Sequence, residues 1–260
     1  MSSENAAIVS IDGAVATVTM NRADAMNAFN QDQRLALTEA LRQVGADKSV
    51  RAVVLTGAGR AFSAGADLNA GFPQDVTVEQ QLQREYRPSF NEIIQMPKPV
   101  IAAINGAAAG IGLSFALICD LAVMANSAFF LAPFSTISLV PDGGANWLLQ
   151  KQLGYKRAFQ LCVEAERLDS ARALEWGLVN RVVESDAVLS NATQWATELA
   201  ARAPLSVVAT KRAMRHAESA DWASTFDMEA AMQSELVGSD DNVEGVKAFF
   251  EKRPARFSGQ

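Results

Sequence analysis

Along the first sixty residues the spacing of hydrophobic and polar positions changes several times. Apolar residues alternate with polar ones over Ile8–Ile11 and Val15–Met20, which is typical of strands, and the Asp-Gly pair between them is a hairpin signal. Over Gln31–Val44 apolar residues recur at helical spacing, and Val50–Leu55 is an apolar run typical of a buried strand. The pattern predicts a hairpin, a helix and a third strand, in that order.

Units of a strand and a helix recur up to about residue 131. The pattern predicts helices over Thr77–Gln95 and Gly110–Ile118, and strands over Val100–Ile104, Leu121–Met124 and Phe129–Leu131. A chain built of such units is expected to form a layered α/β core.

Beyond Ser185 only helical patterns remain. Four helices are predicted here, over Asp186–Arg202, Pro204–Ala217, Trp222–Leu236 and Val243–Lys252. Apolar residues such as Met228, Met232 and Leu236 lie on these helices without a strand to cover them. We therefore expect the C-terminal region to pack against another copy of the chain.

Composition narrows the classes of function. The 260 residues are 49% hydrophobic, enough for a large core, and 23 basic against 29 acidic residues give a net charge of −6. This charge argues against nucleic-acid binding, which normally needs a basic surface. A single histidine, His216, argues against a zinc site, and Cys119 and Cys162 lie in apolar runs typical of buried thiols. The start of the chain shows no targeting pattern, and no apolar run is long enough to cross a membrane, so we expect a soluble cytoplasmic protein without a metal site.

Two glycine-containing turns carry the most informative pattern. Ser63–Leu68 and Gly106–Gly112 each stand where an apolar strand leads into a helix. Such turns leave backbone N–H groups unpaired at the positive end of a helix dipole, and two turns that converge on one oxygen can stabilise a negative charge there. The expected donors are the N–H groups of Ala66 and Ile111. Small residues at such turns also serve tight packing alone, so the turns by themselves leave both interpretations open.

A neighbouring segment, Thr56–Phe62, contains Gly-x-Gly after a strand, as dinucleotide-binding sites do. Phe62 replaces the third glycine of that fingerprint, and no acidic residue follows at the end of a second strand. The sequence therefore argues against a dinucleotide site.

Three segments around the turns are similar to those of one known family. In their order and spacing, Arg60–Leu68, Pro97–Gly106 and Cys119-Asp120 resemble the crotonase (enoyl-CoA hydratase/isomerase) superfamily, and the resemblance spans nearly the whole chain. It implies an α/β fold, a spiral of ββα units with a C-terminal helical region that forms trimers or dimers of trimers. It places the spiral core at residues 1–200 and the trimerisation region at residues 201–260, and it implies an acyl-CoA substrate.

In that superfamily, N–H groups at the positions of Ala66 and Ile111 hold the thioester carbonyl of an acyl-CoA. Ile111 stands in Gly110-Ile111-Gly112, where the family commonly has three glycines. Because only the N–H group is used, the resemblance still implies an oxyanion hole, with the Ile111 side chain narrowing the pocket.

The acidic residues depart from those of the best-known members. Hydratases of the superfamily carry glutamates at the positions of Ser114 and Phe134, and this chain has neither. Hydration needs an activated water and a proton for the α-carbon, so the loss of both carboxylates argues against an ordinary hydratase.

Another acidic residue follows nearby, Asp142 in Val140-Pro141-Asp142-Gly143-Gly144. It lies between a proline and a helix predicted to begin near Ala145, so the residues alone fit an N-cap or turn role as well as a catalytic one. The double-bond isomerases of the superfamily are the Δ3-Δ2-enoyl-CoA isomerases and the bacterial ring isomerase of phenylacetyl-CoA breakdown, and the segment Leu139–Leu149 resembles the ring isomerase most. These isomerases place their catalytic Glu or Asp at this position.

The resemblance also implies contacts with the substrate. The first ligand loop and the turn after residue 63 are expected to border the CoA. Tyr86, Ser114 and Phe134 are expected to line the acyl pocket. The C-terminal helix is expected to reach the phosphate of a neighbour's CoA. The residues concerned are Arg22, Ala25, Ala64, Asp67, Leu68, Tyr86, Ser114, Phe134 and Lys252.

We therefore expect an enoyl-CoA isomerase of fatty-acid or aromatic catabolism. Asp142 would move a proton along the substrate while the oxyanion hole holds the enolate, with no cofactor beyond the CoA of the substrate. Apolar neighbours, Phe134, Ile137 and Leu139, are expected to raise the pKa of Asp142.

Two alternatives stay open. A hydratase, another lyase or a hydrolase would use the same hole with a different acid, such as Glu85 or Asp67. A non-catalytic acyl-CoA binder would keep the CoA-binding turns and tolerate the loss of Asp142.

Overall fold

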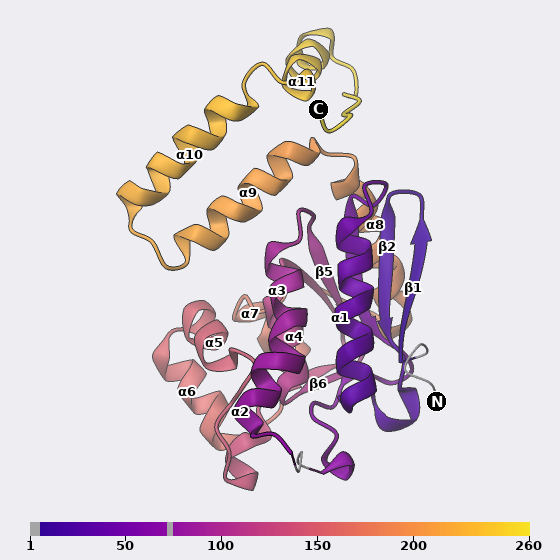
Figure 1. The fold of residues 1–260 in the computed structure, drawn as a ribbon, viewed down its shortest axis with the longest axis vertical. Helices are drawn as coiled ribbons and strands as arrows, with labels where there is room; N and C mark the ends of the chain where they lie inside the picture. The colour runs from indigo at the N-terminus through magenta and orange to yellow at the C-terminus, as the bar shows by residue number, and fades with distance from the viewer. Residues whose placement is uncertain (1–5, 72–74) are drawn as a thin grey trace.

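The hairpin at the start of the chain opens into the larger of two sheets. The computed structural model describes residues 6–71 and 75–260, and the first residues of the chain, used above to look for a targeting pattern, lie outside the described part. The larger sheet has the strand order β1-β2-β3-β5-β7-β10 and the smaller one β4-β6-β8-β9. In the larger sheet only β1 is antiparallel to its neighbour, and in the smaller sheet only β9. The α/β prediction is confirmed (Figure 1).

The strands of both sheets are short, between two and six residues long. Those of the larger sheet are β1 (Ala7–Asp12), β2 (Val15–Met20), β3 (Ala52–Gly57), β5 (Val100–Ile104), β7 (Leu121–Ala125) and β10 (Arg181–Val183). Those of the smaller sheet are β4 (Ala61–Ser63), β6 (Ala107–Ala109), β8 (Phe129–Leu131) and β9 (Leu168–Asp169).

Helices cover both faces of the larger sheet. Figure 1 shows α1 (Gln31–Ala46) in front of the sheet and α8 (Val188–Ala200) behind it. Strands β3 and β5 are buried at every residue for this reason, which explains their unbroken apolar runs. The remaining helices of the body are α2 (Val78–Gln81), α3 (Arg87–Gln95), α4 (Ile111–Ile118), α5 (Ala145–Leu153), α6 (Tyr155–Glu164) and α7 (Ser170–Glu175).

The single helix predicted over Thr77–Gln95 is in fact three segments in succession. A π-helix, η4 (Leu82–Tyr86), joins α2 to α3. Short 3₁₀ turns also occur beside the helices, namely η2 (Ala23–Ala25), η3 (Leu68–Ala70), η5 (Pro133–Ile137) and η6 (Ser185–Ala187).

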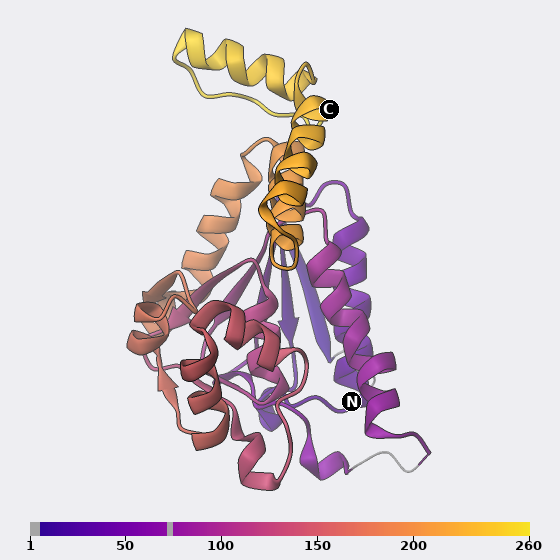
Figure 2. The ribbon, with the colours of Figure 1, turned by 90° about the vertical axis from the view of Figure 1, so that its left-hand side faces the viewer.

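Three helices form an arm that projects from the body. These are α9 (Pro204–Ala217), α10 (Trp222–Leu236) and α11 (Asp240–Glu251), and Figures 1 and 2 show them at one end of the molecule. Helix α11 begins at Asp240 rather than at the predicted Val243 because Ser239 caps it, accepting the Asn242 N–H at 3.2 Å.

The apolar residues of the arm differ from those expected. Met232 is buried within the chain itself, so the expectation that it needs cover from a second copy was wrong. The exposed aromatic side chains of the arm are Trp222, Phe226, Phe249 and Phe250, between 53% and 78% exposed, and aliphatic side chains such as Met214 and Val237 are exposed as well.

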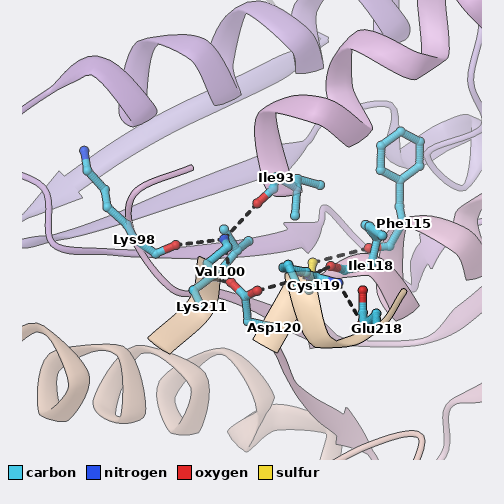
Figure 3. Close-up of polar contacts among 10 residues, drawn as sticks. Ile93, Lys98, Val100, Phe115, Ile118, Cys119, Asp120, Lys211 and Glu218 are labelled. Atoms are coloured by element: carbon cyan, nitrogen blue, oxygen red, sulfur yellow. Dashed lines mark hydrogen bonds and ion pairs between the residues drawn. The ribbon is translucent and has the colours of Figure 1, made fainter. Parts of the chain in front are cut away.

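An ion-pair cluster fastens the arm to the body. Asp120, at the start of β7, binds the ammonium of Lys211 at 2.7 Å and the guanidinium of Arg215 at 3.1 Å, both on α9 (Figure 3). The Val100 N–H also donates to the Asp120 carboxylate at 2.9 Å, and Lys211 donates to the Lys98 carbonyl at 3.0 Å. Asp120 therefore joins the arm to the body.

The two cysteines, Cys119 and Cys162, are both buried free thiols.

Within the described residues, no helix combines the length and apolar character needed to cross a membrane.

Candidate active site

The two glycine turns lie side by side because β4 and β6 are paired. Ala61 lies opposite Ala107, and Ser63 lies opposite Ala108. Gly65 follows β4 with a φ of +94°, and a Cβ atom there would lie 2.8 Å from the Ala109 carbonyl oxygen. Only glycine fits such an approach, so the sequence at Gly65 lets one backbone touch the other.

The N–H group of Ala66 is directed by its neighbours. The Phe29 N–H donates to the Gly65 carbonyl at 2.8 Å, and the Asp67 N–H donates to the Phe29 carbonyl at 3.2 Å. In extended backbone consecutive N–H groups point to opposite sides, so the Ala66 N–H faces away from Phe29. It has no protein hydrogen-bond partner among the described residues.

The N–H group of Ile111 is free for a different reason. Ile111 is the first residue of α4, where N–H groups have no partner within the helix, and Gly110 before it offers no capping side chain. In the described part of the chain this N–H likewise has no hydrogen-bond partner. Gly110 adopts a φ of +55°, and a Cβ there would lie 3.6 Å from the Gly65 Cα. Two unpaired donors therefore lie on touching turns, one of them at the positive end of a helix dipole.

Asp142 lies on a turn that packs against the same helix. The next residue, Gly143, has a φ of +60°, and a Cβ there would lie 2.8 Å from the Ile111 side chain and 2.9 Å from the Ser114 Cβ. The Ser114 hydroxyl donates to the Asp142 carbonyl at 2.9 Å. Helix α4 thus fixes Asp142 relative to Ile111.

The Asp142 side chain does not cap a helix. Gly144 is the N-cap of α5, without a side-chain hydrogen bond, and the Ala145 N–H is accepted by the backbone carbonyl of Asp142 at 3.0 Å. One carboxylate oxygen, Oδ1, is buried and has no hydrogen-bond partner in the described structure. Burial raises the pKa of Asp142 to about 6, as the sequence predicted in direction.

Tyr86 lies close enough to Asp142 for their charges to interact. Burial is the main cause that raises the pKa of the Tyr86 phenol, and the negative charge of Asp142 adds to the effect. Phe134 is also buried and lies near Gly110, 4.0 Å from a Cβ built there. Ile137 and Leu139 are about half exposed, 50% and 47%, so they enclose Asp142 less than expected.

The two other acids considered from the sequence are both paired. Glu85 accepts from the Arg34 guanidinium at 2.6 Å, and Asp67 binds Arg22 at 2.9 Å. Asp67 also caps η3 by accepting the Asn69 N–H at 3.2 Å. The carboxylates of Glu85 and Asp67 are therefore occupied by arginines, whereas Oδ1 of Asp142 has no partner in the described structure.

The predicted substrate contacts fall around two cavities. Arg22 and Ala25 line a cavity of about 330 Å³. Ala66, Asp67, Leu68 and Tyr86 line a second cavity of about 410 Å³. The ion pair between Arg22 and Asp67 joins the rims of the two cavities.

Three other predicted residues lie elsewhere. The Ala64 N–H donates to the Met26 carbonyl at 2.9 Å, so Ala64 joins the first loop to the glycine turn. Ser114 is fully buried beneath Asp142. Lys252 follows α11 as its C-cap residue, and Figure 1 shows α11 at the opposite end of the molecule from α2, whose last residue, Gln81, lines the second cavity.

Sequence reasoning missed Arg34, Phe29 and the role of Gly143. Arg34 stands on the predicted helix α1 like any surface arginine, yet it is only 8% exposed. A Gly-Gly pair after Asp142 was the one available signal for the close packing at Gly143.

Comparison with known proteins identifies the family and the fold. Residues 10–260 match the family model described as enoyl-CoA hydratase/isomerase. The chain is 37% identical over 256 residues to the 1,2-epoxyphenylacetyl-CoA isomerase of Escherichia coli, covering 96% of this chain and 97% of that protein. It is 33% identical over 254 residues to the 2,3-dehydroadipyl-CoA hydratase of the same organism, covering 97% and 98%. The crystal structure of an enoyl-CoA hydratase from a Polaromonas species superposes with a TM-score of 0.91 at 33% identity, covering 97% of this chain and 99% of that one.

Proposed function

The chain belongs to the enoyl-CoA hydratase/isomerase family of enzymes, the crotonase superfamily, and we propose that its reaction is the isomerisation of a β,γ-unsaturated acyl-CoA to the α,β-unsaturated thioester. The relatives named above include both an isomerase and a hydratase, so the proposal rests on the site residues of this chain.

The first step is binding of the thioester carbonyl. The N–H groups of Ala66 and Ile111 donate to the carbonyl oxygen, which makes the protons on C2 more acidic. Because both donors belong to backbone held by paired strands and a helix start, they need no rearrangement when charge develops. The CoA portion extends past Arg22 and Ala25.

The second step is transfer of one proton along the chain of the substrate. The Asp142 carboxylate takes a proton from C2, and the electron pair of that bond delocalises onto the thioester oxygen as a dienolate. The same carboxyl then gives the proton to C4 while the double bond forms between C2 and C3. The proton removed from C2 is returned at C4, so the substrate and the product have the same atoms and electrons. The step needs only these residues and the substrate.

The observation that carries the proposal is the unpaired, buried oxygen of Asp142. A base that also acts as an acid works best with a pKa near the working pH, and burial brings Asp142 to about 6. Glu85 and Asp67 are held by arginines, while Ser114 and Phe134 supply no carboxylate at the positions that hydratases use.

The test is product analysis with two substrates. We expect the protein to convert a 3-enoyl-CoA to the conjugated 2-enoyl-CoA, and to hydrate a trans-2-enoyl-CoA far more slowly. Asp142→Asn is expected to lower isomerisation by roughly two to four orders of magnitude with little change in binding of a saturated acyl-CoA, because it removes only the basic group.

Asp221→Asn serves as the matched control. Asp221 caps α10 on the arm by accepting the Ser224 N–H at 2.8 Å, and asparagine caps as well, so turnover should not change. Rapid formation of a 3-hydroxyacyl-CoA, or full activity of Asp142→Asn, would overturn the proposal.

A further inference from the structure

A nearly buried ion pair lies in the wall of the second cavity and has no part in the mechanism above. Arg34 of α1 donates from Nε to the Glu85 carboxylate of the π-helix at 2.6 Å. The two side chains are 9% and 18% exposed, and both residues line the cavity beside Ala66 and Tyr86.

Arg34 also contacts Phe29, whose backbone directs the Ala66 N–H through an isolated β-bridge. Its Nη1 donates to the Phe29 carbonyl at 3.0 Å. The same carbonyl accepts the Asp67 N–H, so one oxygen holds both the arginine and the turn that contains Ala66. Through this contact Arg34 supports one side of the cavity.

The other side of the cavity is the segment that carries Tyr86. The Arg34 guanidinium carbon lies 5.1 Å from the centre of the Tyr86 ring, and Glu85 is its neighbour in the chain. The π-helix that contains both residues is a rare element that is frequently found at functional sites. Arg34 is therefore in contact with both walls, one through Phe29 and one through Glu85 and Tyr86.

Stability alone is a weak reason for such a pair. Removing two charges from water costs about as much as their attraction returns, and apolar replacements of similar volume are often neutral for stability. What the pair supplies is a fixed geometry, because the planar guanidinium donates in several set directions at once.

We propose that Arg34 and Glu85 are positioning residues that hold the Tyr86 segment at a set distance from the Ala66 turn, and so tune the site for the acyl group. The inference rests on the proposed function for its catalytic part. The pair lies in the cavity of Tyr86 and away from that of Arg22 and Ala25, so we expect its main effect on the acyl group; its one link to the expected CoA contacts is the Phe29 carbonyl, which also holds the Asp67 N–H.

The test compares ligands that differ only in the acyl group. Free CoA and octanoyl-CoA are titrated calorimetrically into the wild type, the double variant Arg34→Met/Glu85→Met and the single variant Glu85→Gln. We expect the double variant to fold, to bind free CoA within about twofold of the wild type, to lose roughly fivefold or more in affinity for octanoyl-CoA and to lose roughly tenfold in kcat with a 3-enoyl-CoA. Glu85→Gln keeps an oxygen for Arg34 and is expected to stay within about threefold of the wild type in each measurement.

Arg42→Met is the matched control. Arg42 lies on the same helix, two turns further along, and pairs with Glu92 of α3 at 3.4 Å in an exposed position. This variant breaks an ion pair between the same two parts of the fold without touching the cavity, so no ligand affinity should change.

Three results would overturn the proposal. The double variant binds octanoyl-CoA and turns over like the wild type; or it loses free CoA and octanoyl-CoA equally; or Glu85→Gln abolishes turnover with binding intact, which would make Glu85 the catalytic acid. If the wild type does not isomerise a 3-enoyl-CoA, the proposed function fails, and the ratio of octanoyl-CoA to CoA affinity still decides the role of Arg34.

Discussion

Among Asp67, Glu85 and Asp142, the acids around the site, Asp142 is the one whose carboxylate has no arginine partner in the described structure. Arg22 and Arg34 neutralise Asp67 and Glu85, whereas Oδ1 of Asp142 has no partner in the described structure. Its position is fixed through the main chain instead, by the Ser114 hydroxyl on its carbonyl. A carboxylate held in this way is placed firmly and is still free to exchange a proton.

The raised pKa of Asp142 predicts the pH dependence of isomerisation. The base must be ionised to take a proton from C2, so kcat/KM should rise with pH, pass its midpoint near pH 6, where the pKa lies, and level off above. The measurement is a pH–rate profile with a 3-enoyl-CoA. A profile that is flat between pH 5 and pH 8 would exclude Asp142 as the base in this range.

The same pKa has a consequence for stability. Burial raises the pKa of Asp142 from its usual 3.8 to about 6, so the folded state holds the proton more tightly than the unfolded chain does. The stabilisation from protonated Asp142 is full below about pH 4 and is lost as pH rises through 6.

Asp142→Asn, neutral at every pH, should therefore gain unfolding free energy relative to the wild type as pH rises from 4.5 to 7.5, by at most about 2 kcal/mol. Urea denaturation at the two pH values measures the difference. A relative loss of stability at pH 7.5 would contradict the burial of this charge.

Sequence reasoning reached the site residues that a motif marks. The glycine turns and the Pro-Asp-Gly-Gly segment point to Ala66, Ile111 and Asp142, and the structure places the three around the start of α4. Arg34 could not be found this way, because its burial depends on the π-helix that brings Glu85 opposite it. The residues that surround Arg34 are set by the fold, so the segment that contains Arg34 does not show them.

At the scale of elements, the long amphipathic or apolar segments and the short strands β7 and β8 were predicted, whereas the short strands β4 and β6 were not. The hairpin, α1, β3 and β5 follow from alternation, periodicity or an unbroken apolar run, and all four are confirmed. Strands β4 and β6 have three residues each, too few for a period, and are defined by pairing within the smaller sheet, β4 with β6 and β6 with β8. The π-helix η4 was missed because a single five-residue turn is too short to show a period of its own, so the segment was predicted as one continuous helix.

The contact between the two glycine turns predicts that replacing Gly65 has a larger effect than replacing Gly13. Gly65→Ala adds a Cβ that overlaps the Ala109 carbonyl, whereas Gly13 of the hairpin also has a positive φ, +56°, with nothing within 4 Å of an added Cβ. Both substitutions carry the left-handed backbone cost of about 1 kcal/mol. Only Gly65→Ala should cost more than that and lower isomerase activity, because it pushes the Ala66 and Ile111 donors apart.

Chemical denaturation and kcat measure this pair of variants. Equal stability and activity of Gly65→Ala and Gly13→Ala would show that the turns tolerate separation.

For the whole molecule, the surfaces left uncovered predict self-association. The arm exposes Trp222, Phe226, Phe249 and Phe250, while the body exposes Val140, Tyr155 and Phe159, each more than half exposed. Apolar surface of this extent on both parts is typical of interaction sites. We expect sedimentation at micromolar protein to give a species heavier than one chain, and Phe249→Ser/Phe250→Ser to lower its mass. A wild type that sediments as a single chain would contradict this expectation.

The reach of the arm has a consequence for how the enzyme responds to dilution. The two cavities described above are lined by residues of the body, whereas Lys252 follows α11 of the arm, which Figure 1 shows at the other end of the molecule from α2; we therefore expect any contact of Lys252 with a CoA phosphate to be with the CoA of a neighbouring copy. Affinity for the substrate then becomes a function of enzyme concentration: diluting the enzyme until the copies separate should raise KM severalfold, an effect that Lys252→Ala should already show at high concentration, with kcat nearly unchanged. A KM that stays constant over the whole range of enzyme concentrations would mean that each chain recognises CoA with its own residues alone.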